Sequence, residues 1–164
     1  MQIVLNHTQI QQKISRIAHE IIENTFDEKK IFIAGICGNG FLIAKEIQEI
    51  IKTNSEIETS IFEISLDKEN PLSSEIKASF DISSFKNEYL ILVDDVVNSG
   101  KTMQYALTKI LENPTKNIKT VALVDRTHRR FPIKCDYVGL TLSTTIKNRV
   151  EVDFTTQESF AYLI

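Results

Sequence analysis

The sequence is poor in the residues that build covalent or metal-bound frameworks. Its 164 residues include two cysteines, three prolines, five glycines and no tryptophan. Cys37 and Cys135 lie far apart and without the spacing of metal ligands, so we expect neither a disulfide framework nor a zinc site. A chain with so few cysteines suits a reducing compartment, and we expect a cytoplasmic protein.

Long apolar runs are also absent. No stretch approaches the roughly 18 uncharged apolar residues of a membrane span, and residues 1–8 lack the basic start and apolar core of a signal peptide. We therefore expect a protein that is neither secreted nor membrane-spanning. The formal net charge of −3 argues against nucleic-acid binding over the whole surface but is compatible with a local basic patch.

The remaining composition is that of an ordinary globular protein. Apolar residues make up 42% of the chain and charged residues 25%. The length of 164 residues suits one domain with a sizeable core, so we expect residues 1–164 to form a single domain.

Hydrophobic patterns along the chain alternate between those of strands and those of helices. A capping box at Thr8-x-x-Gln11, followed by isoleucines at helical spacing, predicts a helix over residues 8–24. The polar segment 67–84 is predicted to be a mobile loop with at most a weak hairpin, and the tail after Thr155 a last turn of helix. Further helices are expected over 41–51 and 101–111, and strands over 30–36, 57–66, 90–93, 118–124, 136–142 and 149–154. Such alternation implies a parallel sheet with right-handed crossovers.

The segment from Tyr89 to Thr102 combines a buried strand with the groups that a sugar phosphate needs. The apolar run ends in Asp94 and Asp95, whose carboxylates suit vicinal ribose hydroxyls or a hydrated Mg²⁺. A small-residue turn, Asn98-Ser-Gly-Lys-Thr102, then starts a helix, and its free backbone N–H groups suit a phosphate. A nucleotide P-loop would need glycine where Asp95 stands, so that interpretation fails.

Ligands of parallel sheets bind at the carboxyl ends of the strands. Turns follow buried strands at 35–40, at 98–102 and at Asp125-Arg126, so we expect all three turns at one edge of the sheet and a single active site there.

The string from Tyr89 to Thr102 resembles the phosphoribosyl pyrophosphate (PRPP) signature of type I phosphoribosyltransferases. Three other stretches resemble the pyrimidine operon regulator family (PyrR), whose members double as uracil phosphoribosyltransferases. They are Ser15–Glu23, the Gly35-Ile-x-x-x-Gly40 loop, and Asp125-Arg-Thr-His-Arg-Arg-Phe-Pro-Ile-Lys-Cys-Asp-Tyr-Val-Gly139. The last is similar to the family's Asp-Arg-Gly-His-Arg-Glu-Leu-Pro-Ile-Arg-Ala-Asp-Tyr-Val-Gly.

This resemblance implies an α/β protein with the parallel-sheet, Rossmann-like fold of type I phosphoribosyltransferases, with a small hood and a mobile loop. It also implies a homodimer or higher homo-oligomer that binds PRPP and a nucleobase or nucleoside monophosphate. Mg²⁺ would be the cofactor, held through PRPP and water near the two aspartates rather than by direct protein ligands.

Roles for individual residues follow from the resemblance together with their chemistry. Asp94 and Asp95 are the expected catalytic residues, since they would hold the ribose hydroxyls. The 5′-phosphate would lie against Val97, Asn98, Ser99, Gly100, Lys101 and Thr102, and the pyrophosphate against Ile36, Cys37, Gly38, Asn39 and Gly40. Asp125 and Arg126 would border the base pocket, unless they form a plain surface ion pair. Tyr137 and Val138 would pack on the base or in the core.

Three departures from the family pattern stand out. The pyrophosphate loop lacks the family's arginine and reads Cys37-Gly38-Asn39, and the loop that normally carries an Arg-Asp pair offers Lys68. Thr127 replaces a glycine. Because the first two changes remove cations that would neutralise departing pyrophosphate, weakened catalysis is expected alongside retained PRPP binding.

The sequence alone does not decide which nucleobase is the substrate or whether RNA is a partner. Asn98 stands where hypoxanthine-type enzymes carry an aspartate, and an amide cannot act as a base. This favours uracil over a purine without excluding the purine. Arg16, His19, His128, Arg129 and Arg130 match the family's RNA-binding face, so an RNA-binding regulator of pyrimidine genes is the alternative from another class, although these side chains could also form a solvated surface.

Overall fold

The computed structural model describes residues 1–143, 148–154 and 157–164. Its centre is a six-stranded sheet in the order β4-β3-β2-β5-β6-β7. The strands are β2 (Lys30–Ile36), β3 (Glu58–Ser65), β4 (Lys77–Ala78), β5 (Tyr89–Val97), β6 (Asn117–Asp125) and β7 (Tyr137–Thr141). All neighbours pair in parallel except β4, which runs antiparallel to β3. The expected α/β fold with a parallel sheet is therefore confirmed.

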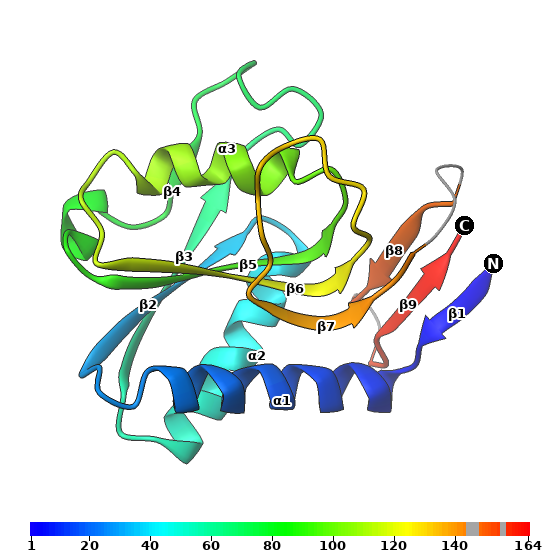
Figure 1. The fold of residues 1–164 in the computed structure, drawn as a ribbon, viewed down its shortest axis with the longest axis horizontal. Helices are drawn as coiled ribbons and strands as arrows, with labels where there is room; N and C mark the ends of the chain where they lie inside the picture. The colour runs from blue at the N-terminus through cyan, green and yellow to red at the C-terminus, as the bar shows by residue number, and fades with distance from the viewer. Residues whose placement is uncertain (144–147, 155–156) are drawn as a thin grey trace.

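Helices cover both faces of this sheet (Figure 1). Helices α1 (His7–Asn24) and α2 (Asn39–Asn54) share one face, where isoleucines at helical spacing, such as Ile14 and Ile47, are fully buried. The other face carries α3 (Lys101–Ile110) and the 3₁₀ turn η1 (Ile82–Phe85). Because both faces are covered, the central strands are almost continuously apolar.

Both chain ends join in a second, smaller sheet. It is antiparallel, in the order β1 (Gln2–Leu5), β9 (Phe160–Leu163), β8 (Val150–Asp153). This sheet corresponds to the expected small hood. The prediction of a helical turn after Thr155 was wrong, because residues 160–163 pair on both sides as a strand and bury Ala161. The strand at residues 2–5 was not predicted from the sequence.

Helix α1 begins at a different cap from the one that the sequence suggested. Asn6 is the N-cap, and its side chain accepts from the backbone N–H of Gln9 while the Gln9 side chain accepts from the N–H of Asn6. The capping box predicted at Thr8 was therefore wrong by two residues. No described helix is long and apolar enough to cross a lipid bilayer.

The segment predicted as a loop contains some regular structure. It includes β4, which pairs with the end of β3 as the expected weak hairpin. Phe85 then stacks on Phe62 with ring centroids 4.9 Å apart, which anchors the second half of the segment to the sheet. The first half, residues 67–76, has no helix or strand and lies beside the carboxyl edge of the sheet.

Strand register brings the three predicted turns to one edge. Gly35 pairs with Val93, and Val97 pairs with Asp125, so β2, β5 and β6 end side by side. The backbone N–H of Arg126 donates to the carbonyl of Val97 at 2.9 Å, and Asn39 reaches Asp95. The predicted convergence of the three turns is confirmed.

Candidate functional site

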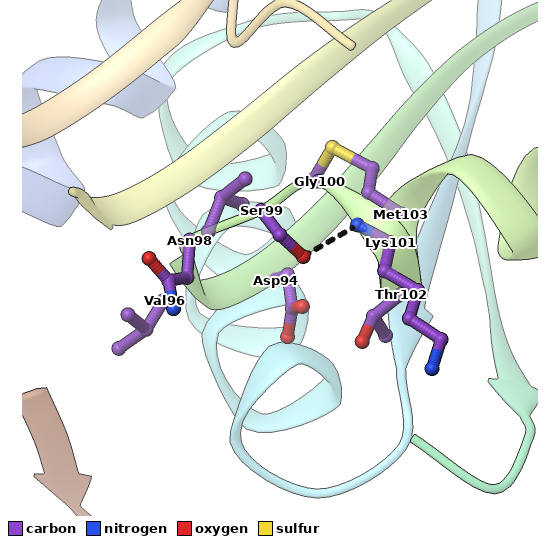
Figure 2. A pocket seen from close by; sticks show the side chains of 9 residues that line it. Asp94, Val96, Asn98, Ser99, Gly100, Lys101, Thr102 and Met103 are labelled. Atoms are coloured by element: carbon purple, nitrogen blue, oxygen red, sulfur yellow. Dashed lines mark hydrogen bonds between the residues drawn. The ribbon is translucent and has the colours of Figure 1, made fainter. Parts of the chain in front are cut away.

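Residues 97–102, which we call the phosphate turn, join β5 to α3. Gly100 caps the helix with φ of +83°, a left-handed conformation that favours glycine. Helix α3 then presents the backbone N–H groups of its first turn, which have no partners within the helix. In Figure 2 the side-chain oxygens of Ser99 and Thr102 and the carboxylate of Asp94 all face the same small cavity. Donors at a positive helix end are suited to a phosphate group.

Asp94 and Asp95 lie at the carboxyl end of β5, but their environments differ. The side chain of Asp94 is only 4% exposed, and burial together with the neighbouring Asp95 raises the pKa of Asp94 well above its ordinary value. Asp95 is partly exposed; its Oδ1 accepts from the N–H of Val96 and its Oδ2 from the Asn39 amide. A nearby cation would lower this pKa and favour the ionised form of Asp94.

Lys68 is such a cation, and it offsets the raised pKa of Asp94 only in part. Its Nζ lies 3.6 Å from Oδ1 of Asp94, although Lys68 belongs to the loop after β3. Burial opposes the charge on Lys68, but the carboxylates of Asp94 and Asp95 outweigh it and the pKa of Lys68 is raised. The sequence placed Lys68 only near an expected arginine. The structure shows a positive charge directly against Asp94.

Residues 36–40 are predicted to contact pyrophosphate and are called the pyrophosphate loop; the side chain of Asn39 fixes their position. Its Nδ2 donates to Oδ2 of Asp95 at 3.0 Å and to the carbonyl of Val152 in β8 at 2.7 Å. Gly40 packs closely on the end of β5, where a Cβ would come within 2.8 Å of the Val93 carbonyl oxygen. Asn39 thus joins the pyrophosphate loop, the aspartate pair and the small sheet.

Residues 126–133, which we call the clamp segment, lie against the phosphate turn. Asp125 begins this contact: its Oδ1 accepts from the N–H of Thr127 and its Oδ2 from Arg129. Arg126 is 4% exposed, and burial lowers the pKa of its guanidinium. Thr127 has φ of +60°, a left-handed conformation. A β-branched residue is strained in this conformation, which glycine would adopt without strain.

Two residues expected in the base pocket lie elsewhere. Tyr137 and Val138 are the first residues of β7, a parallel strand whose carboxyl end is at Thr141. Tyr137 instead lines a hollow with Tyr89 and Asn24 at the opposite edge of the sheet. The base-pocket prediction was therefore wrong for these two residues, since the direction of β7 turns them away from the site.

The residues predicted to form an RNA face are partly engaged within the protein. Arg16 donates to the carbonyls of Val138 and Gly139 and pairs with Glu20. Arg129 is used by the clamp segment, whereas His19 and Arg130 are exposed. His128 lines a cavity beside the phosphate turn together with Arg129 and Arg130. An RNA-binding role for this set stays a prediction.

The aspartate pair suits an indirect role toward Mg²⁺. Within the described ranges no group of three His, Cys, Asp or Glu side chains could hold a metal ion. Mg²⁺ commonly keeps several waters and is bound by one or two carboxylates plus substrate phosphates. Asp94 and Asp95 supply carboxylates of this kind at the end of β5, beside the phosphate turn.

Comparison with known proteins agrees with this geometry. A family model described as the phosphoribosyl transferase domain matches residues 2–158. The chain belongs to the phosphoribosyltransferase family. This phosphoribosyltransferase is 33% identical over 160 residues to the bifunctional protein PyrR of Clostridium novyi, covering 92% of this chain and 88% of that protein. It is 32% identical over 157 residues to the bifunctional protein PyrR of Streptococcus pneumoniae, covering 93% and 89%. The resemblance to the PyrR family is confirmed.

Solved structures show that the fold of this phosphoribosyltransferase is shared more widely. The hypoxanthine phosphoribosyltransferase of Trypanosoma cruzi superposes with a TM-score of 0.75 at 17% identity, over 98% of this chain and 95% of that one. A hypoxanthine-guanine phosphoribosyltransferase from Bacillus anthracis gives a TM-score of 0.71 at 19% identity, over 87% and 82%. At these identities the likeness shows the type I fold alone.

Proposed function

We propose that this phosphoribosyltransferase transfers the 5-phosphoribosyl group of PRPP to uracil, giving UMP and pyrophosphate in pyrimidine salvage. The observation that carries this proposal is the meeting of three elements at one sheet edge: the phosphate turn, the aspartate pair and Lys68. Each matches one part of PRPP, namely the 5′-phosphate, the ribose hydroxyls and the pyrophosphate. A homo-oligomer remains part of the proposal.

In the proposed reaction, the bond between ribose C1 and pyrophosphate breaks while the bond between C1 and a uracil nitrogen forms, and that nitrogen loses its proton. The ribose carbon becomes cation-like in the transition state. Asp94 and Asp95 would hold the hydroxyls and oppose the developing charge, and Lys68 would neutralise the departing pyrophosphate. Bound Mg²⁺ would supply further positive charge to the pyrophosphate oxygens.

The choice of uracil rests on the sequence of residues 125–139 and on Asn98 rather than on the fold. Asp125 to Gly139 resembles the PyrR family, and relatives with matching length carry the name bifunctional protein PyrR. Asn98 provides an amide where hypoxanthine-type enzymes use a carboxylate, so it cannot take a proton from a purine.

The test is product formation from PRPP and Mg²⁺ with uracil, guanine or hypoxanthine at equal concentration, separated by chromatography. We expect UMP to form fastest. Asp95→Asn is the matched variant, because it keeps the size of the side chain and removes its charge; its turnover should fall with all bases. Faster formation of GMP or IMP than of UMP would contradict the choice of uracil.

Regulation of RNA is the second candidate, supported by the word bifunctional in the names of the relatives and by the exposed Arg130. Arg16 and Arg129 are poor probes of it. Both donate to backbone carbonyls within the protein, so their substitution would disturb packing as well as any RNA contact. A charge reversal at Arg130 is the cleaner variant for measuring RNA retention at low salt.

A further inference from the structure

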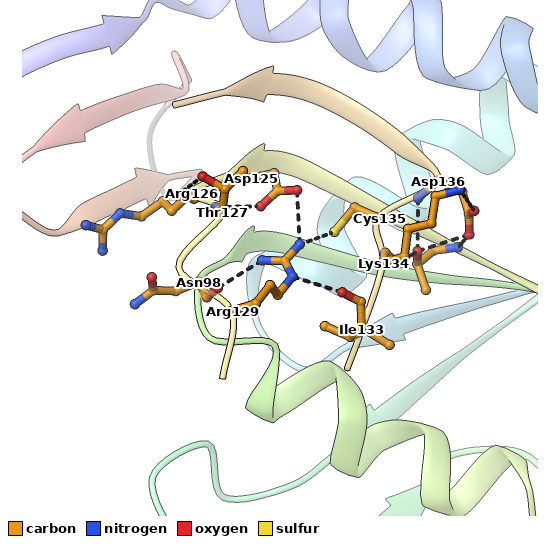
Figure 3. A network of polar contacts seen from close by, with 10 residues as sticks. Asn98, Asp125, Arg126, Thr127, Arg129, Ile133, Lys134, Cys135 and Asp136 are labelled. Carbon is orange, nitrogen blue, oxygen red and sulfur yellow. Dashed lines mark hydrogen bonds and ion pairs between the residues drawn. The ribbon is translucent and has the colours of Figure 1, made fainter. Parts of the chain in front are cut away.

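The carbonyl groups of residues 97–99 in the phosphate turn all accept hydrogen bonds from the clamp segment. The Val97 carbonyl accepts from the N–H of Arg126 at 2.9 Å, and the Ser99 carbonyl accepts from the N–H groups of Arg130 and Phe131 at 2.9 and 3.0 Å. Between them, the Asn98 carbonyl accepts from Nη1 of Arg129 at 2.9 Å (Figure 3). Three successive carbonyls of the turn therefore point toward the clamp segment.

This arrangement decides where the N–H groups of the turn point. The peptide bonds are trans, and in a trans peptide the C=O of one residue and the N–H of the next point in opposite directions. Carbonyls of residues 97, 98 and 99 held by the clamp segment thus turn the N–H groups of residues 98, 99 and 100 the other way. A small cavity is lined by Asn98, Ser99 and Gly100, and we infer that these N–H groups face it. A phosphate there would meet these donors, and the carbonyls of residues 97–99 would point away from it.

Only the central carbonyl of the three is held by a side chain. The guanidinium of Arg129 is itself fixed on several sides: Nη2 donates to Oδ2 of Asp125 at 3.0 Å and Nε donates to the carbonyl of Ile133 at 3.0 Å. Nη2 also lies 3.2 Å from the sulfur of Cys135. Burial raises the pKa of that thiol to about 12, so the sulfur stays neutral. The side chain of Arg129 is 24% exposed.

We propose that Arg129 is a positioning residue for the 5′-phosphate, which orients the Asn98–Ser99 peptide so that its N–H faces the phosphate cavity. This proposal rests on the proposed function, since it concerns the same ligand. The planar fork of arginine can serve Asn98, Asp125 and Ile133 together, and a lysine cannot. Arg129 also links the phosphate turn to Asp125 at the expected border of the base pocket.

Two ligands separate this role from a general structural one. Ribose 5-phosphate probes the phosphate turn, and pyrophosphate with Mg²⁺ probes residues 36–40. In Arg129→Lys and Arg129→Gln, calorimetry should show ribose 5-phosphate binding weakened by about tenfold or more, while pyrophosphate binding stays within twofold. In the steady state, KM for PRPP should rise more than kcat falls. Lys134→Met is the matched control, because that side chain is 87% exposed and lies in the same stretch of chain.

The outcomes are distinct. Unchanged ribose 5-phosphate affinity in both Arg129 variants would overturn the positioning role, and so would equal weakening of both ligands, which a loss of packing would produce. Full rescue by Arg129→Lys would show that only the charge matters and would also overturn it. If the wild type binds neither ribose 5-phosphate nor PRPP, the proposed function itself fails. Circular dichroism and thermal unfolding establish that the variants compared are folded.

Discussion

The phosphate turn and the pyrophosphate loop follow the same plan but are completed differently. Each follows a buried parallel strand and starts a helix, and each contains a glycine with positive φ: Gly100 at +83° and Gly38 at +88°. Around Gly100 the clamp segment is so close that an added Cβ would lie 2.1 Å from Cγ2 of Ile133. Around Gly38 an added Cβ would meet no atom within 4 Å.

This difference shows how charge is distributed over the site. The backbone of the phosphate turn is held by the clamp segment, which donates hydrogen bonds to the carbonyls of residues 97–99. The pyrophosphate loop has free space around Gly38 and carries no cationic side chain. The amide of Asn39 donates hydrogen bonds to Asp95 and to the carbonyl of Val152. The positive charge beside this loop comes from Lys68 on a separate loop. In the proposed function, binding of the 5′-phosphate would therefore rest mainly on backbone groups, whereas neutralisation of pyrophosphate would depend on the side chain of Lys68.

The largest expected effect on ligand binding distinguishes a substitution at Gly100 from one at Gly38. Gly100→Ala should weaken ribose 5-phosphate binding by more than tenfold, because the new Cβ displaces Ile133 in addition to about 1–2 kcal/mol of backbone strain. Gly38→Ala should strain the backbone without displacing a neighbour, and should weaken pyrophosphate rather than ribose 5-phosphate. Calorimetry with both ligands checks this crossover. An equal loss of affinity for ribose 5-phosphate in the two variants would contradict this difference between the phosphate turn and the pyrophosphate loop.

The second effect concerns Lys68. Lys68→Met should lower kcat on the order of 100-fold, because a charge that stabilises departing pyrophosphate is lost. The affinity for PRPP should change less, since the backbone donors of the phosphate turn remain. Lys77→Met is the control, as Lys77 is exposed in β4 beyond the same loop. A raised KM for PRPP with unchanged kcat would show instead that Lys68 contributes only to uniform binding.

The smallest expected effect concerns backbone strain at Thr127 in the clamp segment. Thr127→Gly should raise the free energy of unfolding by about 1 kcal/mol, because glycine adopts φ of +60° without the strain of a β-branched residue. For a protein of this size that gain corresponds to roughly 2–4 °C in Tm. Ribose 5-phosphate affinity should stay within twofold of the wild type. A fall in Tm would mean that the hydroxyl contact of Thr127 with the Arg126 carbonyl outweighs the strain.

Local sequence patterns predicted the structure correctly where short-range properties alone decide it. The strand, acid pair and small-residue turn of residues 89–102 were recognised because buried apolar runs and turn chemistry are short-range properties. Helix caps and the chain ends were harder to predict from the sequence. Asn6 rather than Thr8 caps α1, and residues 160–163 form a strand only because β1 and β8 lie on either side. The pairing of two chain ends leaves no periodic signal in either one.

The sequence by itself indicated the family, through the resemblance of its motifs. It also determined the parallel sheet and the edge at which the site lies, because alternating strands and helices bring the carboxyl ends of parallel strands together. Only the tertiary structure decided which side chains serve that site. It turned Tyr137 to the opposite edge, placed Lys68 against Asp94, and engaged Arg129 with the Asn98 carbonyl. Spacing along the chain carries no record of such contacts, since each depends on strand direction and on how loops from distant elements pack together.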